Sequence, residues 1–145
     1  MIVYMDASAL VKRYVAEAGS ADVAAVVDAA ELVATAVISR VEVSAALARA
    51  ARTGLAAREA VASCLTEFEA EWSDFLRLDV NEAAVARASA LAWSQQLRGY
   101  DAVHLACALL WHEALGSPVT LATYDRELWR GAQAAGLIAW PDRLQ

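Results

Sequence analysis

Four acidic residues stand at points where the chain changes from one kind of segment to another. Asp6 directly follows the apolar run "IVYM", and Asp125 comes one tyrosine after "VTLAT". Asp101 precedes the apolar stretch "AVHLACALL", and Glu42 lies near the start of an alanine-rich stretch. All four offer hard carboxylate oxygens and no sulfur, which suits Mg²⁺ or Mn²⁺ better than zinc. If these side chains converge, the chemistry they indicate is metal-assisted.

Each of these acids, taken alone, also has an ordinary structural explanation. Asp6, Asp101 and Asp125 fit the N-cap of a following helix, and Ser39 with Glu42 has the spacing of a capping box. Two like charges about 4 Å apart, however, repel by roughly 4 kcal/mol at an effective dielectric constant near 20. Helix ends offset only about 0.3–1 kcal/mol each. Four carboxylates gathered in one place therefore favour a bound divalent cation.

Three further polar residues lie beside these acids. Ser8 is two positions after Asp6, and Thr123 is two positions before Asp125. Their hydroxyls either assist a site or make ordinary capping and strand-end hydrogen bonds. His104 follows Asp101 by one helical turn within an apolar helix. Its main interpretation is a packing and hydrogen-bonding residue, with a role in the site as the alternative.

The segments around these residues alternate between short apolar runs and helical patterns. Strands are expected at 2–5, 31–35, 75–80, 119–123 and, as a short fifth strand, 137–140. Helices are expected at 8–16, 20–30, 39–53, 56–72, 81–96 with Asn81 as the cap, 101–115 and 126–135. This alternation predicts an α/β/α sandwich of three layers with a mainly parallel sheet of four to five short strands, and one domain over residues 1–145. Sites in such sheets form beyond the carboxyl ends of the strands, where Asp6 and Asp125 are expected.

Composition excludes several classes of protein. With 59% hydrophobic and 21% charged residues, the chain is long enough and apolar enough to bury a core. A net charge of −6 argues against a broad basic face for capturing nucleic acid. No membrane span or signal peptide is evident, so we expect a cytoplasmic protein. Cys64 and Cys107 are isolated and are expected to be reduced core residues.

At the four acids the sequence resembles the PIN-domain ribonucleases, and within them the VapC-like toxins of bacterial toxin–antitoxin pairs. The matching motifs, in order, are "DASALVKRY" (6–14), "ISRVEVSAAL" (38–47), "LRGYDAVHLACA" (97–108) and "LATYDRELWRGAQAAGL" (121–137). No one of these motifs is specific, but four in register over almost the whole chain make a strong resemblance. Glycine and tyrosine before Asp101 differ from many relatives and bear on substrate fit.

The resemblance carries several implications for function. It implies that Asp6, Glu42, Asp101 and Asp125 form an acidic quartet that binds one or two Mg²⁺ or Mn²⁺ ions, assisted by the hydroxyls of Ser8 and Thr123. It implies metal-dependent hydrolysis of RNA phosphodiester bonds, with 5′-phosphate and 3′-hydroxyl products. It also implies a homodimer that is silenced by a cognate antitoxin protein.

Other functions fit the residues less well. Phosphoryl transfer through an aspartyl intermediate normally needs a second acid two residues after the first, where this chain has Ser8. A dinucleotide-binding fold needs a glycine fingerprint after the first strand, which is missing. A receiver-type domain needs a late strand-end lysine, but Lys12 is the only lysine. A PIN-like binding module without catalysis remains the alternative from a different class.

Overall fold

A parallel sheet of five strands forms the centre of the computed structural model, which describes residues 1–144. Its strands are β1 (Ile2–Met5), β2 (Leu32–Ala36), β3 (Leu76–Leu78), β4 (Val119–Ala122) and β5 (Ile138–Trp140). Their order across the sheet is β3-β2-β1-β4-β5, and every neighbouring pair is parallel. In the register of the central strands, Tyr4 of β1 lies opposite Ala34 on one side and Leu121 on the other.

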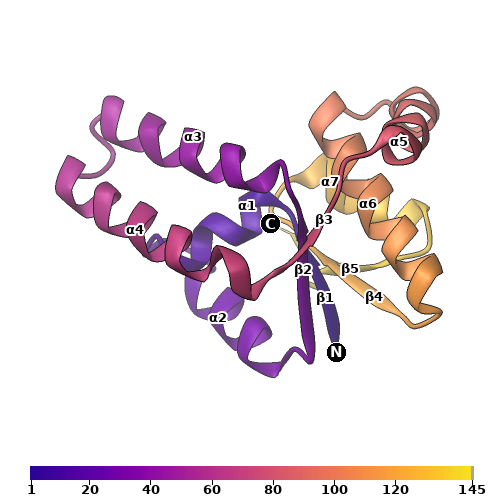
Figure 1. Ribbon diagram of the computed structural model, residues 1–145, viewed down its shortest axis with the longest axis horizontal. Helices are drawn as coiled ribbons and strands as arrows, with labels where there is room; N and C mark the ends of the chain where they lie inside the picture. Colours follow the sequence, from indigo (N-terminus) through magenta and orange to yellow (C-terminus); the bar gives the residue numbers. More distant parts are fainter. Residues whose placement is uncertain (145) are drawn as a thin grey trace.

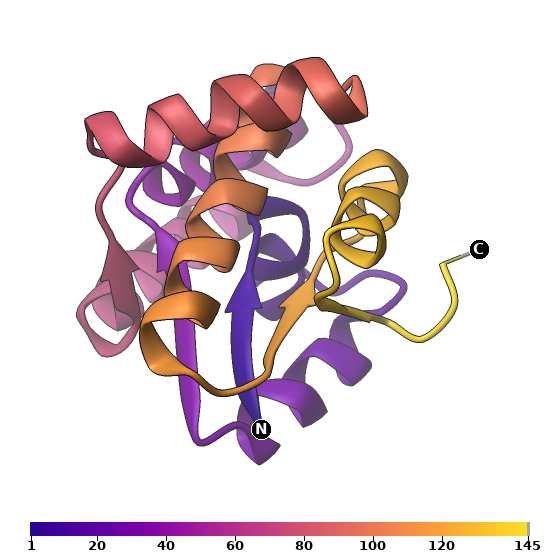
Figure 2. The same ribbon diagram turned by 90° about the vertical axis from the view of Figure 1, so that its right-hand side faces the viewer.

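Helices cover both faces of this sheet. They are α1 (Ala7–Leu10), α2 (Ser20–Ala29), α3 (Ser39–Arg52), α4 (Arg58–Glu71), α5 (Glu82–Gln95), α6 (Gly99–Leu115) and α7 (Arg126–Ala134), with 3-10 turns η1 (Val11–Arg13) and η2 (Trp72–Asp74). The helices α1 to α4 lie on one side of the sheet and α5 to α7 on the other (Figure 1). Figure 2 looks onto the second side, where α6 runs along the strands and α5 packs against it. The expected three-layer α/β/α architecture is confirmed.

The central strand β1 explains why its sequence is apolar throughout. Successive side chains of a strand point to opposite faces, so both faces of a sheet covered by helices need apolar residues. Val3 and Met5 enter the core with α1 to α4, whereas Tyr4 enters the core with α5 and α6. All three are almost completely buried. This packing fixes the end of β1, and therefore the position of Asp6.

Several element boundaries differ from the sequence-based expectation. The helix expected at 8–16 begins at Ala7 and tightens into a 3-10 turn after Leu10. The helix expected at 101–115 begins at Gly99, two residues earlier, so Asp101 lies inside its first turn. Asn81 does cap α5, accepting a hydrogen bond from the Ala84 N–H at 3.0 Å.

Two smaller expectations can also be compared with the structure. Cys64 and Cys107 are free thiols, as expected, and Cys107 is buried. Within residues 1–144, none of the helices combines the length and the apolar character needed to cross a bilayer.

Candidate active site

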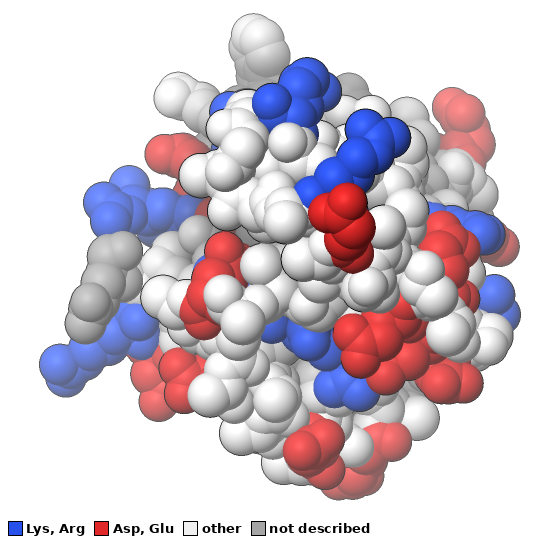
Figure 3. Space-filling model, turned by 90° about the vertical axis from the view of Figure 1, so that its left-hand side faces the viewer, with Lys and Arg blue, Asp and Glu red and all other residues white. Residues whose placement is uncertain are grey.

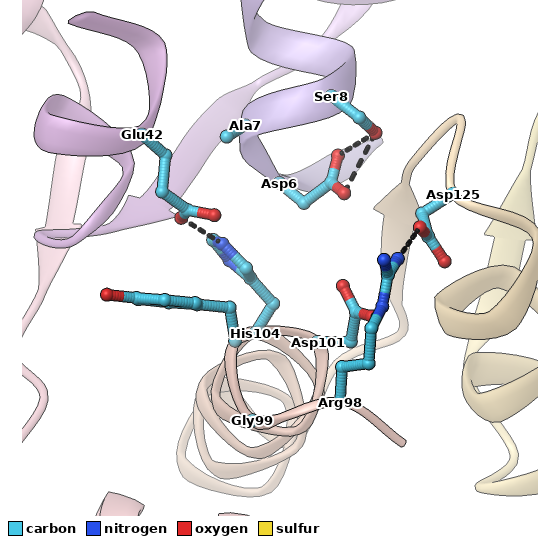
Figure 4. A pocket seen from close by; sticks show the side chains of 10 residues that line it. Asp6, Ala7, Ser8, Glu42, Arg98, Gly99, Asp101, His104 and Asp125 are labelled. Carbon is cyan, nitrogen blue, oxygen red and sulfur yellow. Dashed lines mark hydrogen bonds and ion pairs between the residues drawn. The ribbon is translucent and has the colours of Figure 1, made fainter. Parts of the chain in front are cut away.

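A pocket of about 590 Å³ opens at the edge of the sheet where β1 and β4 end. Figure 4 shows that side chains from four parts of the chain point into it: the β1–α1 junction, α3, the start of α6 and the start of α7. The residues that line it are Asp6, Ala7, Ser8, Glu42, Arg98, Gly99, Tyr100, Asp101, His104 and Asp125. The parallel sheet therefore gathers all four predicted acids around one cavity.

Asp6 is the most buried of the four acids, with 4% of its surface exposed. Its carboxylate caps α1 by accepting the Ala9 N–H at 3.0 Å, so the capping interpretation holds for this residue. The same carboxylate also accepts the hydroxyls of Ser8, at 2.7 and 2.9 Å from its two oxygens, and of Thr123, at 2.7 Å. Burial raises the pKa of Asp6, because these hydrogen bonds only partly offset the loss of water around the charge.

The hydroxyls of Ser8 and Thr123 connect the two strand ends. Ser8 Oγ accepts the Tyr124 N–H at 2.8 Å, and Thr123 Oγ1 accepts the Asp125 N–H at 3.0 Å. Each hydroxyl thus donates to Asp6 while accepting from the turn between β4 and α7. The two hydroxyls hold Asp6 and the start of α7 at a fixed separation.

Glu42 does not form the expected capping box with Ser39. The Ser39 hydroxyl is buried and bonds instead to Thr35 Oγ1 at 2.6 Å, and α3 begins without a side-chain cap. Glu42 Oε1 lies 2.7 Å from His104 Nε2, across the pocket from its own helix (Figure 4). The capping interpretation is wrong here because both members of the spacing have other partners.

His104 connects Glu42 to the core of the molecule. It is 2% exposed, and its second ring nitrogen, Nδ1, lies 2.7 Å from the hydroxyl of Tyr4. Tyr4 is completely buried, and burial raises the pKa of its hydroxyl well above the ordinary value. A phenol held in this way stays protonated. Glu42, His104 and Tyr4 therefore form a continuous hydrogen-bonded row from the pocket to β1.

Asp101 and Asp125 share a single guanidinium. Arg98 Nη2 donates to Asp125 Oδ2 at 2.7 Å, and Arg98 Nε donates to Asp101 Oδ2 at 3.2 Å (Figure 4). Asp125 also caps α7, because its other oxygen accepts the N–H groups of Glu127 and Leu128. Burial, and then the nearby charge of Asp125, raise the pKa of Asp101. Asp101 is no cap, since Arg98 occupies that position of α6.

Comparison with known proteins assigns this arrangement to a family. The family model for the PIN domain matches residues 3–133. The chain belongs to the PIN-domain family. The ribonuclease VapC45 of Mycobacterium tuberculosis (strain CDC 1551 / Oshkosh) is 38% identical over 148 residues, which cover 99% of this chain and 97% of the relative. Within the family, the chain therefore belongs with the VapC proteins.

Solved structures agree with this PIN domain at the level of the fold. The crystal structure of PAE2754 from Pyrobaculum aerophilum is 24% identical and covers 96% of this chain and 83% of its own, with a TM-score of 0.66. A toxin-antitoxin complex from Klebsiella pneumoniae is 18% identical and covers 85% of this chain and 86% of its own, with a TM-score of 0.61.

The chemistry of the donors in this PIN domain fits a hard divalent cation. Four carboxylates line the pocket, and one guanidinium faces them. Within residues 1–144, no three acidic, histidine or cysteine side chains are already placed to enclose one ion. Arg98 holds Asp101 and Asp125, and His104 holds one oxygen of Glu42. The donor types are therefore suitable, and Arg98 competes with an ion for one oxygen each of Asp101 and Asp125.

Sequence reasoning did not single out Arg98 or Tyr4 for this pocket. Arg98 carries a usable signal, because a residue three positions before Asp101 faces the same side of a helix. Tyr4 carries none, since a tyrosine inside an apolar strand has the pattern of an ordinary core residue. Its hydroxyl matters only because α6 brings His104 within reach.

Proposed function

We propose that this PIN domain is a divalent-metal-dependent endoribonuclease that hydrolyses RNA phosphodiester bonds and acts as the toxin of a toxin–antitoxin pair. The observation that carries the proposal is the gathering of Asp6, Glu42, Asp101 and Asp125 around one pocket, with one guanidinium to balance them. Such an excess of negative charge is costly for a purely structural cluster and useful for holding cations. The name of the ribonuclease relative supports the same activity.

The four acids are the residues that would hold one or two Mg²⁺ or Mn²⁺ ions. When bound, such an ion polarises the phosphate, lowers the pKa of an attacking water and stabilises the departing oxygen. Asp6 binds with its geometry already fixed by Ser8 and Thr123. Asp101 and Asp125 contribute after Arg98 has left them. Ser8 and Thr123 act by orienting Asp6. Thr123 is fully buried and bonds to Asp6 from the protein interior.

Binding of RNA relies on local rather than overall charge. The face with α3 and α4 carries acidic and basic groups side by side, without a continuous basic area (Figure 3). Arg98 is the one cationic side chain among the described residues that line the pocket, and its side chain is 75% exposed. We expect its guanidinium to turn from the aspartates to a phosphate of the substrate, where a fork of N–H donors binds well.

The partners in this proposal are an RNA substrate, a second copy of the chain and a cognate antitoxin. The toxin-antitoxin complex among the structural relatives supports the antitoxin. An acidic pocket attracts a basic peptide segment, which is one physical route to inhibition. A toxin that blocks translation by cutting RNA acts in the cytoplasm. The homodimer is proposed from the family resemblance alone.

Metal removal tests the central claim. Purified protein is incubated with end-labelled RNA in Mn²⁺ or Mg²⁺, in excess EDTA, and in EDTA followed by excess Mn²⁺. We expect cleavage with either metal, loss of cleavage in EDTA and its return when Mn²⁺ exceeds the chelator. Cleavage at full rate in EDTA would overturn the mechanism. Failure to cut any RNA, with Mn²⁺ shown to bind, would favour a catalytically silent binding module.

A further inference from the structure

The side chain of His104 is engaged at both ring nitrogens, although it lies in the core. Nε2 is 2.7 Å from Glu42 Oε1, and Nδ1 is 2.7 Å from the Tyr4 hydroxyl. The imidazole is 2% exposed, so its own nitrogens have little access to solvent. These two bonds satisfy both ring nitrogens and connect α6 to β1 and α3.

The partners define the direction of this row of hydrogen bonds. An ionised carboxylate can only accept, so Nε2 carries the hydrogen that is given to Glu42. In the neutral ring Nδ1 is then an acceptor, and it takes the hydrogen of the Tyr4 hydroxyl. The Glu42 carboxylate therefore sets the tautomer, and the Tyr4 hydroxyl completes the row by donating to Nδ1. Both ring nitrogens of His104 and the hydroxyl of Tyr4 are thus satisfied.

The row leaves Glu42 with one oxygen held and one oxygen available. Oε1 is bound by His104, whereas Oε2 has no hydrogen-bond partner among residues 1–144. Figure 4 shows the Glu42 carboxylate at the border of the pocket, on the same side as Asp6. His104 also lies one turn after Asp101 on α6. One helix thus presents Asp101 directly and orients Glu42 through His104.

We propose that His104, held at Nδ1 by Tyr4, is a positioning residue that holds Glu42 ready to bind a metal ion through its free oxygen. The inference rests on the proposed function, because it assigns the orientation of one ligand of the same site. A flexible glutamate loses much rotational freedom when it binds a cation. A partner that already restricts the side chain reduces that loss, as hydrogen-bond partners of metal ligands generally do.

The competing explanation is that His104 only stabilises the fold. Its ring also packs edge-on against Tyr4, with centroids 5.9 Å apart. The two explanations differ in whether the effect of His104 passes through Glu42. A double-mutant cycle between the two residues separates them.

The experiment measures Mn²⁺ affinity by calorimetry for the wild type, His104→Leu, His104→Gln, Tyr4→Phe, Glu42→Gln and the double variant His104→Leu/Glu42→Gln. We expect His104→Leu to weaken binding about tenfold in the wild-type background and less than about twofold when Glu42 is already glutamine. His104→Gln retains an N–H near the position of Nε2 and should recover most of the affinity. Tyr4→Phe removes one oxygen atom and should weaken binding by about threefold, since Nδ1 loses its partner and the ring is held less firmly.

Each result either supports the inference or overturns it. Equal weakening by His104→Leu in both backgrounds, or no weakening in the wild-type background, would show that His104 acts only on the fold. If His104→Leu unfolds the protein, the Mn²⁺ affinities of Tyr4→Phe and His104→Gln decide instead. A Tyr4→Phe protein that binds Mn²⁺ as tightly as wild type would overturn the inference. Absence of Mn²⁺ binding by the wild type would instead refute the proposed function.

Discussion

The acidic pocket has two halves that are held in different ways. The inner half consists of Asp6 and Glu42, whose oxygens accept hydrogen bonds from hydroxyl, peptide and imidazole donors. The outer half consists of Asp101 and Asp125, which share the guanidinium of Arg98. The inner donors belong to buried or half-buried residues, whereas the Arg98 side chain is 75% exposed.

This difference separates orientation from neutralisation. Uncharged donors fix the direction of a carboxylate but leave its charge in place, and for Asp6 the burial of that charge raises the pKa. A guanidinium offsets part of the negative charge of its two partners, and an exposed one can leave without opening the core. Under the proposed function, the inner half is arranged in advance for a cation, and the outer half would become available when Arg98 moves. Substitutions in each half should behave accordingly.

The largest effect is expected for Asp6→Asn. The amide keeps the shape of the side chain but removes the charge, so RNA cleavage should fall by at least about 100-fold, as expected when several kcal/mol of metal-assisted stabilisation are lost. The melting temperature of the metal-free protein should be unchanged or slightly higher, because a carboxylate with a raised pKa destabilises the fold at neutral pH. Initial rates and melting temperatures in EDTA measure the two quantities.

Asp28→Asn is the matched control for this substitution. Asp28 is exposed on α2, which contributes no residue to the pocket, so Asp28→Asn should change neither rate nor stability. The comparison fails if Asp6→Asn lowers the melting temperature strongly while Asp28→Asn does not. Asp6 would then be a structural cap whose charge the fold needs.

An intermediate effect is expected for Arg98→Gln, which should strengthen the binding of Mn²⁺ and weaken the binding of RNA. Removing the guanidinium frees Asp101 and Asp125, so the affinity for Mn²⁺ should rise by about fivefold to tenfold, the lower end of typical couplings between two sites. The same change removes the cation that meets the RNA phosphate, so KM for RNA should rise. Calorimetry gives the first quantity and steady-state cleavage the second.

Arg52→Gln, at an exposed position of α3, controls for the loss of one positive charge. It should leave the affinity for Mn²⁺ unchanged. If Arg98→Gln and Arg52→Gln behave alike, the pairing of Arg98 with the outer half has no functional consequence. A rise in Mn²⁺ affinity without a change in KM would keep the competition and remove the role in RNA binding.

The same division explains what could be predicted from the sequence. The strand ends placed Asp6 and Asp125 correctly, because parallel strands bring their carboxyl ends to one edge. Hydrogen-bond partners that were predicted from short spacings in the sequence were less reliable. The Ser39–Glu42 spacing fitted a capping box, yet both side chains bond to residues outside it.

Contacts between distant segments account for what sequence reasoning missed. Tyr4 and His104 are 100 positions apart, and only the packing of α6 on β1 unites them. Arg98 reaches Asp125 over 27 positions for a similar reason. Local spacing predicts the elements and the ends at which acids gather. It does not predict which side chain crosses between elements, because that depends on how the layers pack.

The smallest effect should come from a charged cluster outside the pocket, where the pKa of the acid is lowered rather than raised. Glu71, at the end of α4, accepts hydrogen bonds from Arg13 Nε and the Tyr14 hydroxyl, both at 2.8 Å. The Arg13 guanidinium lowers the pKa of Glu71, so here the ionised form stabilises the fold. Glu71→Gln should therefore reduce the free energy of unfolding at pH 7, by about 0.5–1 kcal/mol after allowance for solvent screening of a partly exposed pair.

The pH dependence of this loss follows from the direction of the Glu71 shift. A carboxyl group whose pKa is lowered in the folded state contributes its full stability above its pKa in the unfolded state, about 4.3. It loses that stability as the pH falls through its pKa in the folded state. The difference between wild type and Glu71→Gln in urea unfolding should thus be present at pH 7 and shrink below about pH 4. Glu67→Gln, exposed on the same helix, should show no such difference. A Glu71→Gln protein as stable as wild type at pH 7 would mean that an acid paired with a guanidinium contributes no more stability than the buried Asp6. The contrast between the Glu71 cluster and Asp6 would then lose its physical basis.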